Sequence, residues 1–114
     1  ELFPFKALIK AGVASVMVGH LAIPAIDAAT NRPTSLSKAA VTGLLRHELG
    51  FEGLVITDGM EMKALTQHYP AGEAAVQALL AGNDLLCLPD DVPAAIAAVE
   101  KALEKKRLKW KDID

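Results

Sequence analysis

Gly53-Leu54-Val55-Ile56-Thr57-Asp58-Gly59 is the stretch that decides the fold class, because an apolar run ends abruptly in a carboxylate and a glycine. A continuous apolar run of this kind predicts a strand that is covered on both faces of a sheet. Runs of the same character lie at residues 13–19 (VASVMVG) and 84–88 (DLLCL). The intervals between the three runs are long enough for crossover helices, so the sequence predicts an α/β protein made of parallel βα units.

Four helices are predicted before, between and after these strands, from capping residues and from apolar residues at helical spacing. The first three cover residues 4–12, 37–50 and 73–81. The fourth begins after Asp90 or Asp91 and runs to residue 103. Helices and strands therefore alternate along the chain, and residues 1–114 are predicted to form a single segment.

The composition of the 114 residues is that of a folded globular unit, with 52% hydrophobic and 23% charged residues. Twelve Lys+Arg against fourteen Asp+Glu leave a net charge of -2, which favours neither nucleic acid nor an anionic membrane as a partner. No apolar run approaches the roughly 18 residues that a membrane-spanning helix needs. Cys87 is the single cysteine, so an intrachain disulfide is excluded.

Polar residues follow each predicted strand, at the edge where parallel α/β proteins bind their ligands. They are His20 after the first strand, Asp58 after the second and Asp90 after the third, and we expect the three to surround one cleft. Asp58 is the strongest candidate, because a carboxylate directly after an apolar strand is solvated only if it points into that cleft. There it would act as a nucleophile, a base or a metal ligand. A cap on the following turn explains the same residue about equally well.

The segment LGFEGLVITDGMEM, residues 49–62, resembles the nucleophile segment of glycoside hydrolase family 3, whose members carry an aspartate just after such a strand. Upstream blocks resemble the β-N-acetylglucosaminidase-like branch of that family, in order, at residues 11–13, 16–20, 23–27, 35–37 and 41–48. Residues 81–86 are similar to the family's final barrel strand. The chain departs from the family pattern at Gly59, where the family leads one to expect alanine, serine or an acid. A glycine there makes the turn more flexible and leaves Asp58 in place.

The resemblance implies a (β/α)8 TIM barrel that acts as a retaining β-glycosidase of the β-N-acetylhexosaminidase type. Asp58 would attack the anomeric carbon of a terminal β-linked sugar and form a covalent glycosyl intermediate. The predicted strands would be strands six to eight, so residues 1–114 would be the C-terminal part of the barrel domain. A carbohydrate is the implied substrate, and neither a cofactor nor a metal is implied.

The acid/base of the family has no counterpart among the motifs of this chain. Residues 1–114 contain neither the upstream Lys-His motif nor the Asp-Ser-His loop of the N-acetylglucosaminidase branch, and the family's glucosidases take a glutamate from a second domain. The isolated chain is therefore expected to be inactive. Three strands leave two open sheet edges, so we also expect association with another copy or with the remainder of the parent barrel.

The resemblance also implies substrate contacts, each with a structural alternative. His20 would contact sugar hydroxyls from the cleft rim, and a buried structural histidine is an equal alternative. Met60 would shape a sugar subsite, although methionine more often fills a core. Glu61 would line the cleft, although an acid that stabilises a helix start is favoured. For Asp90 and Asp91, a role as helix caps is favoured over a catalytic role.

Two further polar residues receive structural interpretations. Arg46 is interpreted as part of a solvated helix face. Asp27 lies in the stretch between the first strand and the second helix and has no predicted partner. A loop of that length inside a compact domain is more often functional than idle.

A receiver domain of two-component signalling is the main competitor from another class, because its phosphorylated aspartate also ends a central strand. It needs a pair of acids after its first strand and a lysine after its last, where this chain has Gly19-His20 and Pro89-Asp90. A dinucleotide-binding module needs a Gly-x-Gly-x-x-Gly after a strand, and this chain has none. A non-catalytic sugar-binding or scaffolding fragment stays open, and Lys-His and Asp-Ser-His motifs in the parent reading frame would exclude it.

Overall fold

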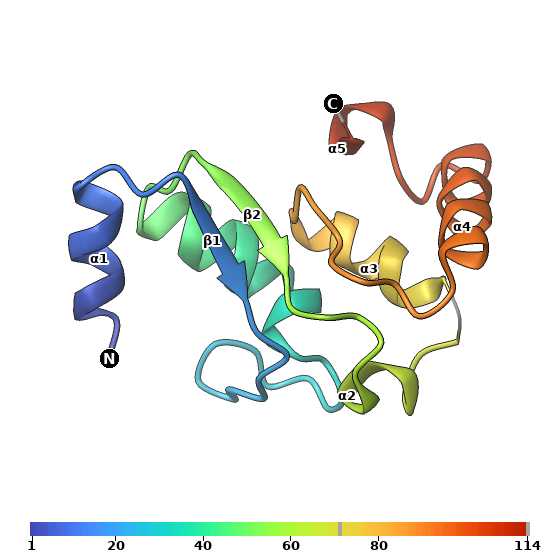
Figure 1. The fold of residues 1–114 in the computed structure, drawn as a ribbon, viewed down its shortest axis with the longest axis horizontal. Helices are drawn as coiled ribbons and strands as arrows, with labels where there is room; N and C mark the ends of the chain where they lie inside the picture. Colours follow the sequence, from blue (N-terminus) through green and yellow to red (C-terminus); the bar gives the residue numbers. More distant parts are fainter. Residues whose placement is uncertain (71, 114) are drawn as a thin grey trace.

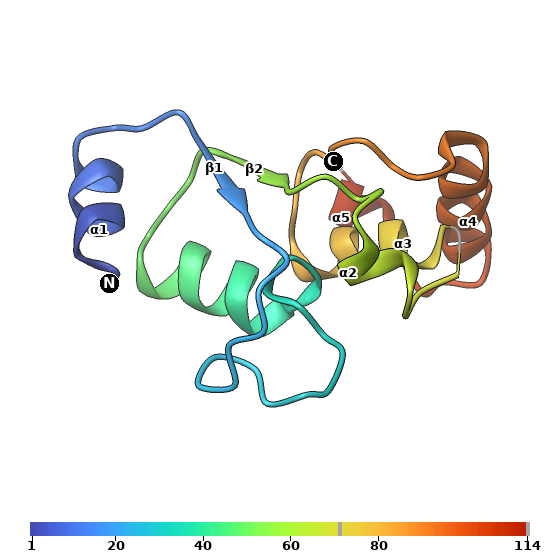
Figure 2. The same cartoon turned by 60° about the horizontal axis from the view of Figure 1, so that its bottom comes forward.

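The computed structural model describes residues 1–70 and 72–113, and Figure 1 shows their arrangement. In chain order the elements are α1 (Phe3–Lys10), β1 (Ser15–Val18), η1 (Thr34–Leu36), η2 (Ala39–Glu48), β2 (Leu54–Thr57), α2 (Lys63–Thr66), α3 (Glu73–Ala81), α4 (Val92–Glu104) and α5 (Trp110–Ile113). Helices α1 and α4 lie at opposite ends of the molecule in both views (Figures 1 and 2). None of the helices within residues 1–70 and 72–113 is long and apolar enough to cross a membrane.

Strands β1 and β2 form a parallel sheet, as their apolar runs predict. Val16 pairs with Val55, and Val18 pairs with Thr57. Figure 2 shows η2 (teal) beneath one face of this sheet. The buried cluster between them contains Val41, Leu45, Phe51, Val55 and Ala81. Because the strands are parallel, their carboxyl ends lie at one edge, toward α2 in Figure 1.

The third predicted strand, residues 84–88, is reduced to a single parallel bridge between Ile56 and Leu85. The segment runs beside β2, but side chains take two of the ladder positions. The Asp84 carboxylate accepts the Val55 N–H at 2.8 Å, and the Thr57 hydroxyl accepts a backbone N–H of the segment at 2.9 Å. The assignment to strands six to eight of a (β/α)8 TIM barrel is therefore wrong, since the described residues hold a two-stranded sheet with several helices.

The four predicted helices are present, although α1 ends at Lys10, before the predicted end at Gly12, and η2 differs more. Helix α3 has the predicted bounds and ends at Gly82, whose φ of 111° lies in the left-handed region that favours glycine. Helix α4 is capped by Asp91, whose Oδ1 accepts the Ala94 N–H at 3.0 Å. Helix η2 begins at Ala39, two residues after Ser37, and is wound as a π-helix. Helices α2 and α5 were not predicted, because four residues are too few to show a helical period.

Helix α3 connects the sheet layer to the C-terminal helices, since it contacts η1, η2, α4 and α5. One buried cluster on this helix contains Leu36, Met60, Leu65, Ala75, Ala78 and Ala95. Another contains Val76, Ala102 and Leu108. Met60 lies two residues after Asp58, so the chain that leaves the carboxyl end of β2 is anchored in this core.

Glu73, the first residue of α3, pairs with Arg107 through two hydrogen bonds. The Oε1–Nη2 distance is 2.6 Å and the Oε2–Nη1 distance is 3.2 Å. The hydrogen bonds from Arg107 hold the pKa of the Glu73 carboxyl below its usual value. A carboxyl whose pKa falls on folding stabilises the folded state above its unfolded pKa, and this contribution is lost as the pH falls through the folded pKa.

We therefore expect Glu73→Gln to lower the unfolding free energy near neutral pH and to have a smaller effect in acid, below the ordinary pKa range of glutamate. Urea unfolding of the wild-type and variant proteins at both pH values measures the difference. An effect of equal size at both pH values would contradict a role for the ionised pair.

Candidate active site

Asp58 lies at the carboxyl end of β2, where the strand gives way to a turn. Its backbone N–H donates to the carbonyl oxygen of Val18, the last residue of β1, at 3.0 Å. Its side-chain Oδ1 accepts the N–H of Gly59 at 2.8 Å. The residue is half-buried. Both strands and the following amide therefore fix the carboxylate at the edge where parallel α/β proteins bind ligands.

His20 follows β1 and lies beside this turn. Its Nε2 is 2.9 Å from the carbonyl oxygen of Gly59, and its Nδ1 is 2.6 Å from the hydroxyl oxygen of Ser35. Because a carbonyl oxygen only accepts, Nε2 carries a proton, and in the neutral ring Nδ1 accepts the hydroxyl proton of Ser35. Both ring nitrogens thus have protein partners. The sugar contact expected of His20 stays a prediction.

The long loop after β1 returns to the strand end through Thr34 and Ser35. Thr34 donates its backbone N–H to the carbonyl oxygen of Leu21 at 2.8 Å and its hydroxyl to that of Gly19 at 2.6 Å. Ser35 is fully buried, and its carbonyl oxygen accepts a hydrogen bond from the Asn83 side chain at 2.8 Å. These bonds hold the end of the loop against the residues that follow β1 and against the segment that follows α3.

Asp27, for which the sequence offered no partner, organises the same loop. Its Oδ1 accepts the N–H of Ala29 at 2.9 Å, and its Oδ2 accepts the hydroxyl of Ser37 at 2.7 Å. Nη1 of Arg32 lies 3.5 Å from the same Oδ2. These contacts, led by the backbone hydrogen bond from Ala29, hold the pKa of Asp27 below its usual value. Asp27 is therefore an ionised anchor of the loop.

Met60 and Glu61 follow the turn and have different surroundings. Met60 is 4% exposed, and its side chain lines a pocket of about 200 Å³ together with Asp90. Glu61 is exposed, and its carboxylate lies over Gly59, where an added Cβ would be 2.9 Å from Oε2 of Glu61. The glycine that departs from the family pattern therefore leaves room for the Glu61 carboxylate. The predicted sugar contacts of Met60 and Glu61 stay predictions.

Two of the three residues expected around one cleft, His20 and Asp90, border different pockets. Asp90 is exposed and borders the Met60 pocket, whereas His20 borders a separate pocket of about 440 Å³ formed largely by the long loop. The structure therefore joins His20 to Asp58 through Gly59, whereas Asp90 shares a pocket with Met60. Across residues 1–70 and 72–113, no three His, Cys, Asp or Glu side chains are grouped as metal ligands.

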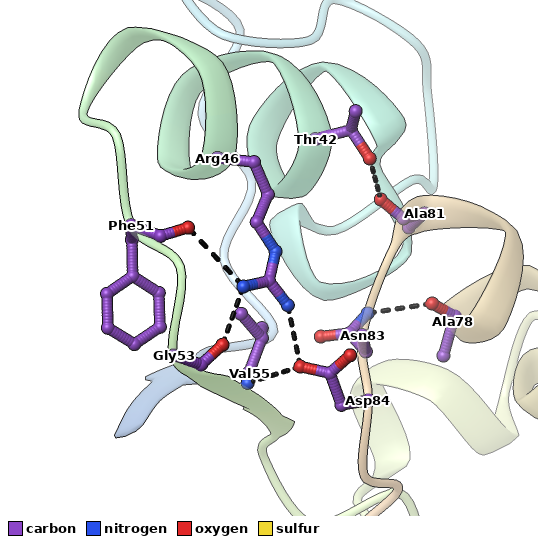
Figure 3. Close-up of polar contacts among 9 residues, drawn as sticks. All are labelled: Thr42, Arg46, Phe51, Gly53, Val55, Ala78, Ala81, Asn83 and Asp84. Atoms are coloured by element: carbon purple, nitrogen blue, oxygen red, sulfur yellow. Dashed lines mark hydrogen bonds and ion pairs between the residues drawn. The ribbon is translucent and has the colours of Figure 1, made fainter. Parts of the chain in front are cut away.

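Arg46 and Asp84 form a polar cluster beside the amino end of β2 that the sequence analysis missed (Figure 3). Arg46 reaches from η2 and donates to the carbonyl oxygen of Gly53 at 2.6 Å and to Oδ2 of Asp84 at 2.6 Å. The same Oδ2 accepts the Val55 N–H at 2.8 Å. The interpretation of Arg46 as part of a solvated face is therefore wrong. The available signal was a lone aspartate, Asp84, at the start of an apolar run.

The sequence and the fold of this chain match those of known proteins. The model of the family described as "Glycosyl hydrolase family 3 N terminal domain" matches residues 1–114. The chain belongs to glycoside hydrolase family 3. The predicted family is thus confirmed, whereas the placement in the C-terminal part of a barrel is not supported, because the matching model is that of the N-terminal domain.

Curated relatives of this glycoside hydrolase family 3 chain include β-hexosaminidases. Beta-hexosaminidase LpqI of Mycobacterium tuberculosis is 35% identical over 122 residues, which cover 100% of this chain and 31% of that protein. The beta-hexosaminidase of Chromobacterium violaceum is 32% identical over 102 residues, which cover 87% of this chain and 28% of that protein. The family 3 chain therefore spans less than a third of the length of these relatives.

Solved structures share the fold of the family 3 chain. A glycoside hydrolase family 3 β-N-acetylglucosaminidase from Paenibacillus sp. str. FPU-7 superimposes with a TM-score of 0.92 and 40% identity, over 97% of this chain and 22% of that one. The beta-glucoside phosphorylase BglX superimposes with a TM-score of 0.85 and 27% identity, over 95% of this chain and 21% of that one. The same arrangement of elements thus occurs in proteins named for hydrolysis and for phosphorolysis.

Proposed function

We propose that this chain supplies the nucleophile of a retaining β-glycosidase of the β-N-acetylhexosaminidase type, and that the nucleophile is Asp58. The observation that carries the proposal is the position of Asp58 at the carboxyl end of β2. Its backbone N–H donates to the carbonyl oxygen of Val18, and its Oδ1 accepts the N–H of Gly59. The names of the two β-hexosaminidases and of the Paenibacillus β-N-acetylglucosaminidase support the substrate class.

Retaining hydrolysis proceeds through two displacements at the anomeric carbon. In the first, an oxygen of Asp58 forms a bond to that carbon, the bond to the leaving-group oxygen breaks, and this oxygen takes a proton from an acid. In the second, water attacks the carbon, the bond to Asp58 breaks, and a proton of the water passes to the same group acting as a base. Oδ1 of Asp58 already accepts the Gly59 N–H, so Oδ2 is the attacking oxygen in this proposal.

We infer that the acid/base lies outside the described residues. The two ring nitrogens of His20 are engaged by Gly59 and Ser35, so neither is free to protonate a leaving group. The relatives are more than three times as long as this chain, which leaves ample sequence for such a group. Without a positioned acid, the sugar's leaving group departs unprotonated, and the rate falls by roughly 10²–10⁴-fold. The 114 residues alone are therefore proposed to be inactive or nearly so.

Met60 and Glu61, which follow Asp58 in the chain, are proposed to complete the site. The exposed carboxylate of Glu61 is a hydrogen-bond acceptor suited to sugar hydroxyls. The buried side chain of Met60 packs in the core and supports the turn from below. This arrangement agrees with both interpretations of Met60, as a core residue and as a residue that shapes a subsite.

Covalent trapping tests the proposal. A fluorinated N-acetylglucosaminide that is attacked normally but released slowly is expected to label Asp58 in the protein expressed from its complete gene. Peptide mapping by mass spectrometry locates the sugar, and Asp58→Ala is the control that should stay unlabelled. A label on another residue would remove the assignment of the nucleophile. Tight binding of the sugar without any label would indicate a non-catalytic sugar-binding protein.

A further inference from the structure

We propose that His20 is a positioning residue, which holds the carbonyl of Gly59 and thereby orients the carboxylate of Asp58. The inference rests on the proposed role of Asp58 as the nucleophile. In this inference His20 affects the rate of the chemical step, whereas the resemblance implies that His20 binds the sugar.

Gly59 is the link between the two side chains. Its N–H donates to Oδ1 of Asp58 at 2.8 Å, and its carbonyl oxygen accepts from Nε2 of His20 at 2.9 Å. Glycine has more backbone freedom than any other residue, so a glycine beside a nucleophile leaves the turn loose unless something restrains it. The hydrogen bond from His20 supplies that restraint at the residue whose N–H orients Asp58.

His20 is itself held from the interior of the protein. Its Nδ1 is 2.6 Å from the hydroxyl of Ser35, which is fully buried. The carbonyl oxygen of Ser35 accepts from Nδ2 of Asn83, which also donates to the carbonyl oxygen of Ala78 in α3, both at 2.8 Å. Hydrogen bonds among buried groups are stronger than those exposed to water. A continuous, mostly buried chain of contacts therefore runs from α3 to His20 and on to the turn.

The occupied ring nitrogens separate a positioning role from direct sugar binding. A sugar hydroxyl would have to displace Ser35 or Gly59 to bind a ring nitrogen of His20. A residue that binds the sugar in the ground state mainly changes KM, whereas a residue that aligns the nucleophile mainly changes kcat. A misplacement of about 1 Å in a reacting group is enough to lower a rate by about 100-fold.

Three substitutions at His20 test the inference in the protein expressed from its complete gene, with an aryl N-acetylglucosaminide as the probe. Glutamine places an amide N–H near the position of Nε2 and keeps the donor to Gly59. Asparagine reaches only as far as Nδ1 and loses that donor, and alanine loses both contacts. We expect His20→Ala and His20→Asn to lower kcat about 10- to 100-fold with little change in KM, and His20→Gln to recover most of the loss.

Controls accompany these kinetics. His47→Ala removes an exposed histidine of η2 and is expected to leave kcat and KM unchanged. The rate of covalent trapping by the fluorinated sugar isolates the first displacement and should follow the same order as kcat. Thermal unfolding of every variant identifies those that fail to fold. If His20→Ala is among them, the comparison of His20→Gln with His20→Asn carries the test.

The outcomes separate the inference from the function on which it rests. A raised KM with unchanged kcat in His20→Ala would overturn the positioning role, and so would equal losses in His20→Gln and His20→Asn. If Asp58→Ala is inactive while His20→Ala keeps the wild-type kcat, only the positioning role fails. If Asp58→Ala keeps its activity, the proposed function itself fails.

Discussion

Replacing Asp58 with alanine is expected to lower the kcat for an aryl N-acetylglucosaminide by about a thousandfold or more, because the proposed first displacement would lose its nucleophile. Alanine keeps the backbone N–H that donates to Val18. The lost side chain is half-buried and bonds only its neighbour, Gly59, among the contacts described above. The protein should therefore stay folded while hydrolysis stops, and steady-state kinetics with parallel thermal unfolding measures both effects.

Azide gives this prediction a chemical control. A small anion can occupy the space left by the carboxylate and attack the anomeric carbon from the same face, which releases the aryl group. Sodium azide is therefore expected to restore part of the rate of Asp58→Ala and to give a glycosyl azide of inverted configuration. Asp90→Ala is the matched variant, because Asp90 is exposed at the end of the neighbouring segment. A comparable loss in Asp90→Ala would move the assignment away from Asp58.

The paired strands and the candidate nucleophile are predictable from the sequence because burial is recorded in unbroken apolar runs. The run before Asp58 contains the whole of β2, and the run at residues 13–19 contains the whole of β1. A strand that ends in a carboxylate points to the carboxyl edge of a parallel sheet without further information. The location of Asp58 in the fold follows from this local pattern alone.

The third segment shows where that reasoning fails. An apolar run indicates that side chains are buried, but it does not indicate which partners the backbone N–H and C=O groups bond. At residues 84–88 the carboxylate of Asp84 and the hydroxyl of Thr57 bond backbone N–H groups that a strand ladder would otherwise use. Only one bridge, between Ile56 and Leu85, remains. A polar residue at the start of an apolar run is thus compatible both with a strand and with a segment held by side chains.

The contacts between side chains far apart in the sequence were beyond prediction for a different reason. His20 and Gly59 are 39 residues apart in sequence, and Arg46 and Asp84 are 38 apart. Periodicity describes single elements, so it carries no information about which side chains meet across such intervals. The family resemblance points to Asp58 as the candidate nucleophile, but the contacts of His20 with Ser35 and with Gly59 emerge only once the loop and the turn are placed together.

Replacing Asp84 with alanine is expected to lower the unfolding free energy by about 2–3 kcal/mol. The larger part comes from the Val55 N–H, because Val55 is fully buried and a buried donor without an acceptor is unfavourable by about 1–3 kcal/mol. The smaller part is the ion pair with Arg46, which is partly exposed and therefore contributes at most about 1 kcal/mol. Urea unfolding of the purified protein measures the sum.

Asp84→Asn divides the two contributions, because the asparagine carbonyl still accepts the Val55 N–H and only the charge is lost. Its expected effect is about 1 kcal/mol or less, and it should shrink at high salt, where partly exposed charges are screened. The remaining difference between Asp84→Ala and Asp84→Asn reports the buried N–H and should be insensitive to salt. Glu52→Ala removes an exposed acid of the same region and is the control, expected to change stability by about 0.5 kcal/mol or less. Equal effects of the two substitutions at Asp84 would show that charge, and not the replaced ladder bond, holds the third segment against β2.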